Sequence, residues 1–165
     1  MNRTQLKCVQ PVHVELRKVQ DTHRDSSYLW MLRNSPRVRK SCVNTECIVW
    51  ESHCQWFTQR LNDPRSSMFV LLVPSWSDLY VGYGRMWCEN NTVTISYAVG
   101  VSFTGQGFGK FIVERLCVES LSVGALQVKA VVKRGNVASI QTLLNNGFHR
   151  CSFSYPGTQT FIRSR

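Results

Sequence analysis

A stretch rich in glycine, FTGQGFGK at residues 103–110, is the first place where this sequence could bind a ligand. Gly105, Gly107 and Gly109 stand at every second position, and an apolar helical pattern begins among them. Glycine lets backbone N–H groups approach a ligand closely, and the positive end of a helix dipole favours an anion. The backbone from Gly105 to Lys110 is therefore a candidate phosphate site. A glycine-rich turn that only packs closely against its neighbours is the alternative.

Spacing excludes two familiar phosphate-binding loops. A dinucleotide-binding GxGxxG turn counted from Gly105 needs glycine at position 110, where the chain has Lys110. A P-loop needs Ser or Thr after Gly109 and Lys110, but Phe111 follows, and Thr104 occupies the first glycine position. What remains is a GxGxG turn between a strand and a helix.

The elements that must position this turn follow from the periodicity of the apolar residues. The predicted strands cover residues 12–19, 68–73, 78–87, 92–100, 125–132, 148–155 and 159–163. The predicted helices cover residues 21–34, 49–63, 108–116 and 136–146, with a short helix or turn at 35–43. Asp21 and Asn136 are the expected N-caps, and Gly147 fits a left-handed helix end. This order predicts one α/β domain over residues 1–165, with a mixed sheet and helices on both faces.

Composition places the chain among ordinary soluble globular proteins. Its 165 residues are 43% hydrophobic and 18% charged, and no apolar stretch reaches the eighteen residues of a membrane span. The first residues lack the apolar segment of a secretion signal, so we expect a cytoplasmic protein. The net charge of +10 favours an anionic ligand or is simply a solvated basic surface. No aromatic residues interleave with the basic ones, so nucleic acid is not the expected partner.

The seven cysteines do not form a metal-binding pattern. Their number is odd, and no pair has the CxxC spacing of zinc or redox sites. We therefore expect reduced, mostly buried thiols and no metal.

A second motif narrows the interpretation of the glycine turn. Asn136 is followed by Ser139, and Gly147-Phe148 begins eleven residues after the asparagine. Together with the turn, in which Thr104, Gly107 and Gly109 correspond to the three defined positions of the Arg/Gln-x-x-Gly-x-Gly/Ala motif, this pattern resembles the GNAT superfamily of acyl-CoA-dependent N-acyltransferases. The resemblance covers nearly the whole chain.

The resemblance implies a fold and a cofactor site. The fold is a mixed, mostly antiparallel sheet of six to seven strands, with a splay between the fourth and fifth strands where the pantetheine arm lies. Acetyl-CoA is the implied co-substrate, with its pyrophosphate on the glycine turn. The implied contacts come from Val99, Gly100, Val101, Thr104, Gly105, Gln106, Gly107, Phe108, Gly109, Lys110, Asn136 and Ser139. For Asn136, this contact is compatible with a helix cap.

The amino-terminal half carries a narrower pattern, LRNSPRVRK at 32–40, ESHCQWF at 51–57 and LNDP at 61–64. It is similar to a subgroup that contains pseudaminic-acid-pathway aminosugar N-acetyltransferases, and it overlaps the ribosomal-protein N-terminal acetyltransferases. The first likeness implies a nucleotide-linked aminosugar acceptor. Its contacts would come from Arg33, Arg37, Arg39 and Trp56. Three exposed arginines after a helix are the structural alternative.

The implied chemistry is direct attack of an amine on the thioester, with a backbone N–H near Val99 stabilising the oxyanion. Many family members carry a Glu base on the fourth strand, where this chain has Ser96 and Tyr97. Many also carry a Tyr acid seven residues after the motif asparagine, where this chain has Leu143. The sequence thus departs from the family at both proton-transfer positions.

Other side chains remain as candidates for proton transfer. His53 and Glu51 are the candidates for base or proton relay, although His53 could equally be packed against Trp56 and Phe57. The candidate donors are Ser139, Tyr97 and Tyr155. Water could also carry the proton away.

Three functions fit these observations. They are an N-acetyltransferase for a small aminosugar or similar amine, a protein N-terminal acetyltransferase, and a non-catalytic acyl-CoA-binding module. The expected partners are acetyl-CoA and a small amine, without a membrane. The sequence leaves open whether the last strand pairs within the chain or in a homodimer.

Overall fold

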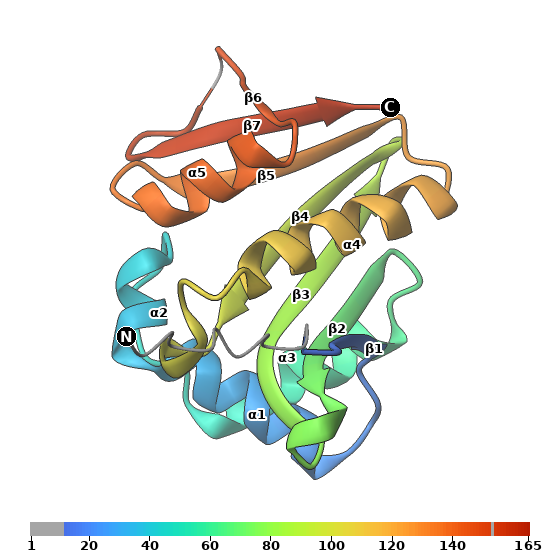
Figure 1. Ribbon diagram of the computed structural model, residues 1–165, viewed down its shortest axis with the longest axis vertical. Coiled ribbons are helices and arrows are strands. Elements are labelled where there is room, and N and C mark those ends of the chain that lie inside the picture. The colour runs from blue at the N-terminus through green and yellow to red at the C-terminus, as the bar shows by residue number, and fades with distance from the viewer. Residues whose placement is uncertain (1–11, 153) are drawn as a thin grey trace, which may run out of the picture.

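The computed structural model describes residues 12–152 and 154–165, and in this part of the chain the strands form one seven-stranded sheet (Figure 1). The strands are β1 (Glu15–Lys18), β2 (Ser66–Val73), β3 (Leu79–Glu89), β4 (Thr92–Val99), β5 (Gln127–Lys133), β6 (His149–Arg150) and β7 (Thr158–Ser164). The α-helices are α1 (His23–Asn34), α2 (Pro36–Ser41), α3 (Trp50–Asn62), α4 (Phe108–Ser122) and α5 (Val137–Asn145). The sheet order is β1-β2-β3-β4-β5-β7-β6. The predicted class, a mixed and mostly antiparallel α/β sheet, is confirmed.

The sheet opens between β4 and β5. These two strands pair in parallel from Thr92 opposite Gln127 to Ile95 opposite Ala130. β4 continues to Val99 and β5 to Lys133 without further pairing to each other, so these two strands separate at their carboxyl ends, as Figure 1 shows. The splay that the resemblance implied is therefore present.

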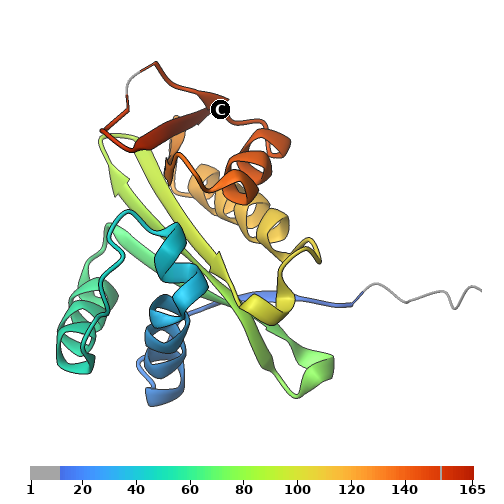
Figure 2. The ribbon, with the colours of Figure 1, turned by 90° about the vertical axis from the view of Figure 1, so that its left-hand side faces the viewer.

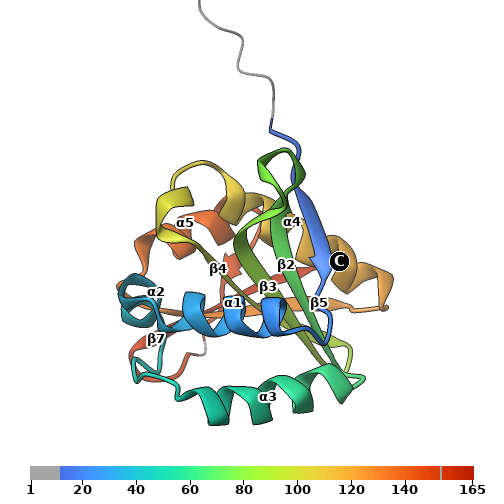
Figure 3. The ribbon, with the colours of Figure 1, turned by 90° about the horizontal axis from the view of Figure 1, so that it is seen from below.

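Helices cover both faces of the sheet (Figure 2). α4 and α5 pack on one face, over a core in which Ile112, Leu116 and Leu143 are fully buried. α1 and α3 run side by side across the other face (Figure 3), where Leu29 and Phe57 pack on β2. β2 lies between the two layers, so it reads as the continuous apolar run that a doubly covered strand requires.

Two glycines in β3 let α4 lie close to the sheet. A Cβ on Gly84 would stand 2.9 Å from Ile112 Cγ2 and 3.0 Å from Leu116 Cδ1. A Cβ on Gly82 would stand 2.9 Å from Ile112 Cδ1. Because the glycines face α4, the alternate residues Tyr83 and Arg85 face the opposite layer.

A buried carboxylate fixes the start of α1. Asp25 is 1% exposed and accepts hydrogen bonds from Arg17 Nη2 at 2.8 Å, Tyr80 Oη at 2.6 Å and the Gln20 backbone N–H at 2.8 Å. The N-cap is Thr22, whose Oγ1 accepts from the Asp25 backbone N–H. This cluster ties α1 to β1 and β3 and so sets the direction of the helix.

Several predicted details are wrong. Asp21 is exposed and does not cap α1, because Thr22 is one residue closer to the first helical turn. The strand expected at 148–155 contains only His149–Arg150, and a turn at 156–157 precedes β7. Of the six described cysteines, Cys117 alone is buried and Cys47 is exposed. Cys8 lies outside the described residues. No helix in the described part of the chain is long and apolar enough to cross a membrane.

Candidate active site

The glycine turn joins β4 to α4 and is shaped by backbone conformation. Gly105 has φ 78° and Gly107 has φ 87°, and an added Cβ at either position would meet no atom within 4 Å. Close packing therefore does not explain these two glycines, whereas a left-handed conformation does. Gly109 differs, because its added Cβ would stand 3.4 Å from Tyr97 Cε2.

The first turn of α4 offers backbone donors. Gly107 is the N-cap of α4 and has no side chain with which to cap it. The N–H groups of residues 108–110 have no intrahelical partner, and the helix dipole adds partial positive charge there. This end of α4 can bind an anion.

The amino end of α5 faces the turn across the splay. Asn136 caps α5, as predicted, and its Oδ1 accepts a hydrogen bond from the Ser139 backbone N–H at 3.2 Å. The Ser139 hydroxyl lies 3.0 Å from the Tyr97 hydroxyl on β4. This hydrogen bond joins the two strand–helix units at the point where the sheet opens.

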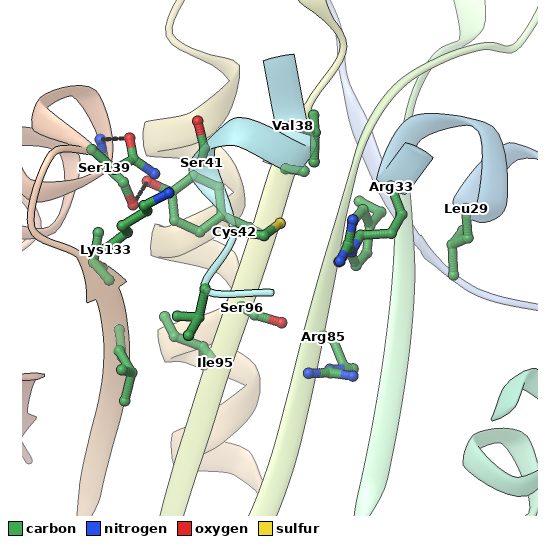
Figure 4. Close-up of a pocket in the computed structure, with 18 of the residues that line it drawn as sticks. Leu29, Arg33, Val38, Ser41, Cys42, Arg85, Ile95, Ser96, Lys133 and Ser139 are labelled. Carbon is green, nitrogen blue, oxygen red and sulfur yellow. Dashed lines mark hydrogen bonds between the residues drawn. The ribbon is translucent and has the colours of Figure 1, made fainter. Parts of the chain in front are cut away.

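Two adjoining spaces meet at this hydrogen bond. The first, which we call the turn cleft, has a volume of about 560 Å³ and lies among the glycine turn, the end of β4, α2 and the start of α5. The second, which we call the inner cavity, has a volume of about 490 Å³ and lies among α1, α2, α3 and the strands β3, β4 and β5 (Figure 4). The residues that line both spaces are Val38, Ser41, Cys42, Tyr97, Ala98, Asn136 and Ser139.

Both spaces are electropositive. The described residues that line them include no Asp or Glu. Arg37 and Lys110 line the turn cleft, and Arg33, Arg85 and Lys133 line the inner cavity. Among the described residues, no group of three His, Cys, Asp or Glu side chains is arranged to hold a metal ion.

Burial shifts the pKa values of Tyr97, at the junction, and of His53, in the inner cavity. Burial raises the pKa of the Tyr97 hydroxyl, while its contacts with Ser139 and Thr142 act in the opposite direction. Tyr97 therefore stays protonated at neutral pH and can donate a proton. Burial lowers the pKa of His53, opposed by the hydrogen bond to the Ser26 carbonyl, so this imidazole is neutral at pH 7.

His53 lies at the edge of the inner cavity inside an aromatic cluster. Its side chain is 3% exposed, and its ring packs against Trp50, Trp56 and Phe57. Its Nε2 lies 2.9 Å from the Ser26 carbonyl oxygen, so a proton on Nε2 is donated there. The Nδ1 atom is then the ring nitrogen that can accept a proton.

A family model described as an acetyltransferase (GNAT) domain matches residues 13–149 of this fold. The chain belongs to the GNAT acetyltransferase family. As a GNAT acetyltransferase, it is an acyltransferase that uses acetyl-CoA as co-substrate, which confirms the prediction from the sequence. A comparison with curated proteins finds no match.

Solved structures share the fold of this acetyltransferase at low sequence identity. A domain from Methanocaldococcus jannaschii has a TM-score of 0.81 at 17% identity, covering 93% of this chain and 99% of that chain. Spermidine N-acetyltransferase from Vibrio cholerae, in complex with CoA and spermine, has a TM-score of 0.79 at 12% identity, covering 92% and 95%. The ribosomal-protein acetyltransferase RimL, in complex with coenzyme A, has a TM-score of 0.75 at 17% identity, covering 93% and 96%.

The acetyltransferase brings most of the predicted cofactor residues together around the turn cleft. The predicted residues that line it are Val99, Thr104, Gly105, Gly107, Gly109, Lys110, Asn136 and Ser139. Gly100, Val101, Gln106 and Phe108 do not line it. Phe108 is buried in the core, and the Gly100 N–H donates to the Val81 carbonyl at 2.8 Å.

The predicted substrate residues of the acetyltransferase do not all lie together. Arg33 and Trp56 line the inner cavity, whereas Arg37 lines the turn cleft. Arg39 lines neither space, and its Nη1 donates to the Thr45 carbonyl at 3.4 Å.

Two predicted proton-transfer residues lie elsewhere. Glu51 is exposed in the first turn of α3 and lines neither space. Tyr155 is exposed in the segment before β7 and also lines neither space.

Sequence reasoning missed Arg85, Tyr83 and Cys42, which all line the inner cavity. A signal for two of them was present in YVGYGRMW, because the small residues Gly82 and Gly84 alternate with the large polar ones. Glycines on one face of a strand indicate that a helix packs closely there. The side chains between them, Tyr83 and Arg85, then point to the opposite side of the sheet. For Cys42, in an irregular segment after α2, no pattern in the sequence pointed to the site.

Proposed function

We propose that this acetyltransferase moves an acetyl group from acetyl-CoA to the primary amine of a small acceptor, preferably a nucleotide-linked aminosugar. Acetyl-CoA occupies the turn cleft and the acceptor occupies the inner cavity. The observation that carries the proposal is that the two spaces meet at the Tyr97–Ser139 hydrogen bond. A cofactor and an acceptor bound in them would have their reactive groups at that junction.

The turn cleft fits the phosphates of CoA. Its rim combines the uncapped N–H groups of α4 with Lys110 and Arg37, and its described lining contains no carboxylate. The gap between β4 and β5 has unpaired strand edges on which an extended, amide-containing arm can lie. Asn136, which is ordered as the cap of α5, lines the same cleft.

The reaction needs two proton transfers that side chains of this chain can perform. Acetyl-CoA supplies a thioester whose carbonyl carbon is attacked by the neutral amine and whose C–S bond then breaks. The Tyr97 hydroxyl, protonated and held by Ser139, donates a proton where the thiolate leaves. Tyr97, on β4, would thus be the general acid, a role that the family often assigns to a tyrosine at the position of Leu143 on α5.

The proton released by the amine needs an acceptor on the other side of the junction. His53 is neutral, lines the inner cavity, and has one ring nitrogen without a proton. We assign it the role of proton relay, with Trp56 and Phe57 holding the ring in place. The proposal gives no step to Glu51, because its side chain lies outside both spaces.

A small acceptor fits the inner cavity, which lies within the usual size range of small-molecule sites. Lys133, which lines the cavity from β5, donates from Nζ to the Lys40 carbonyl on α2 at 3.2 Å. Neighbouring folds act on amines, among them spermidine and an aminoglycoside. A protein amino terminus, as in RimL, is the second candidate acceptor.

We also propose that the enzyme is cytoplasmic, and that it could form a homodimer. The six described cysteines are free thiols, which fits a reducing cytoplasm. Sedimentation at working concentrations would report whether the protein is a homodimer.

The test is release of CoA thiol by the wild type and by Tyr97→Phe, with a panel of amines. We expect kcat to fall about 10²-fold in Tyr97→Phe because the general acid is lost. The KM for acetyl-CoA should change little. Tyr28→Phe is the matched control, since the Tyr28 hydroxyl is also buried but lines neither space.

An unchanged kcat in Tyr97→Phe would remove Tyr97 from the mechanism. Tight binding of CoA without turnover of any aminosugar, polyamine, amino acid or peptide would instead support the non-catalytic module.

A further inference from the structure

We infer that the acceptor carries an oxyanion, a phosphate or a carboxylate, and that Arg33 and Arg85 bind it inside the inner cavity. The inference deepens the proposed function and rests on it, because the acceptor and the anion occupy the same cavity. It assigns a role to Arg85 and a ligand class to the site.

Arg33 is held in place with one donor group unused. It lies in the last turn of α1, and its Nη2 donates to the Asn44 carbonyl at 2.7 Å, which fixes the guanidinium plane. Its Nη1 is buried and has no hydrogen-bond partner among the described residues. A buried N–H without a partner is costly, so a ligand that accepts from it gains affinity.

Arg85 brings a second charge to the same cavity. It stands on β3, directly opposite Ser96 of β4, and its guanidinium carbon lies 5.6 Å from the centroid of the Trp56 ring. The ion pairs in the described part of the chain involve Arg17, Arg60, Arg65 and Arg115, and none involves Arg85 or Arg33. Both charges in the cavity are therefore left without a carboxylate.

The guanidinium groups of Arg33 and Arg85 belong to the same part of the inner cavity. Arg33, Arg85 and Tyr83 all line the inner cavity. Burial raises the pKa of the Tyr83 hydroxyl, and the charges of Arg85 and Arg33 both oppose this rise. The Ser96 hydroxyl is buried and has no hydrogen-bond partner among the described residues. It is therefore a further donor for a ligand. In Figure 4, Arg33 and Arg85 lie on one side of the cavity with Ser96 near them.

This arrangement selects among acceptor amines. A guanidinium pair binds phosphate or carboxylate oxygens through several charge-assisted hydrogen bonds. The described lining offers no carboxylate to a second ammonium group, so a polyamine gains nothing there. The expected substrates have one amine at the junction and one oxyanion at the arginines, which separates this protein from a spermidine acetyltransferase.

The first experiment compares kcat/KM for four acceptors: glucosamine, glucosamine 6-phosphate, glutamate and spermidine. We expect an anionic acceptor to be preferred over glucosamine, and its KM to rise about 10- to 100-fold in Arg85→Gln and in Arg33→Gln. The KM for glucosamine, which carries no oxyanion, should rise less than the KM for the anionic acceptor in both variants. Arg115→Gln, on the exposed face of α4, is the matched control. The phosphate and carboxylate arms identify which oxyanion the site takes.

The second experiment is independent of turnover. Inorganic phosphate and acetate are titrated into the CoA-saturated enzyme by calorimetry, so that the turn cleft is already filled. Binding of one anion that is lost in Arg85→Gln and kept in Arg115→Gln supports the inference, even if the true acceptor is absent from the panel. Anion binding that is absent or equal in both variants overturns it, as does a preference for spermidine. A preference for spermidine would contradict the anion site but leave the proposed acetyl transfer standing. Absence of turnover with every amine would count against acetyl transfer but not against the anion site.

Discussion

Replacement of Gly107 by alanine separates what the backbone of the glycine turn requires from what a ligand requires. Gly107 has φ 87° and caps α4, and an added Cβ would meet no protein atom within 4 Å. The cost in the free protein is therefore conformational and not steric. Holding alanine in this left-handed region costs about 1–2 kcal/mol. For a chain of this size, each kcal/mol lowers Tm by about 2–4 °C.

Gly124 supplies a matched control at the other end of the same helix. It has φ 80°, an added Cβ would also meet nothing within 4 Å, and it lines neither the turn cleft nor the inner cavity. Gly124→Ala and Gly107→Ala should therefore lower Tm by similar amounts. The KM for acetyl-CoA should respond differently, because the Cβ at position 107 would stand where, in our proposal, the backbone N–H groups meet the pyrophosphate.

The assay is thermal melting of both variants together with the KM for acetyl-CoA from thiol release. Loss of one hydrogen bond to a charged group corresponds to about 1.5–3 kcal/mol, or roughly a 10- to 150-fold rise in KM. We expect this rise in Gly107→Ala and an unchanged KM in Gly124→Ala. Equal KM values in the two variants, after equal losses of Tm, would refute the placement of the pyrophosphate on this turn.

Two further predictions concern stability and access. Asp25→Asn should lose about 3 kcal/mol of unfolding free energy at pH 7, because it breaks a buried ion pair with Arg17. Burial acts to raise the pKa of Asp25, but hydrogen bonds from Arg17, Gln20 and Tyr80 bring it below its ordinary value of 3.8, so this stability is present above pH 3.8 and lost as the pH falls further. Urea unfolding should show a smaller difference in unfolding free energy between the wild type and Asp25→Asn at pH 3 than at pH 7. An equal difference at both pH values would contradict the reasoning. Alkylation of Cys42 should inactivate the enzyme and be slowed by acetyl-CoA, because Cys42 lines both spaces. Peptide mass spectrometry should find the exposed Cys47 alkylated at the same rate with and without acetyl-CoA.

Local patterns were enough for most elements of the fold. The alternation in TVTISYAV predicted β4, the apolar run MFVLLV predicted β2, and Asn136 predicted the start of α5. These features depend on neighbours in the chain, so periodicity and capping can reveal them. The cap of α1 was misplaced by one residue because Asp21 and Thr22 are both favourable N-cap types, and local spacing does not show which side chain accepts from the Asp25 backbone N–H.

The site was less accessible to sequence reasoning. The position of the glycine turn followed from spacing, but the splay between β4 and β5 was implied by family resemblance alone. Arg85 was missed because its importance depends on α1 and α3, which bring Arg33 and Trp56 over the same strand face. His53 was found, but its hydrogen bond to Ser26 on α1 joins two helices and leaves no trace in local spacing.

The four residue pairs that join β4 to β5 are also the whole ladder between the amino-terminal strands β1–β4 and the carboxyl-terminal strands β5–β7. Beyond Ile95 and Ala130 the two strands share no ladder hydrogen bonds. There the halves are held together by the packing of α4 and α5 and by the hydrogen bonds from Tyr97 to Ser139 and from Lys133 to the Lys40 carbonyl. The pantetheine arm of acetyl-CoA, bound in that gap, would hydrogen-bond to the free edges of both β4 and β5 and so connect the two halves of the sheet. If acetyl-CoA binds in this gap as proposed, we expect saturation with acetyl-CoA to stabilise the enzyme against separation of the two halves of the sheet.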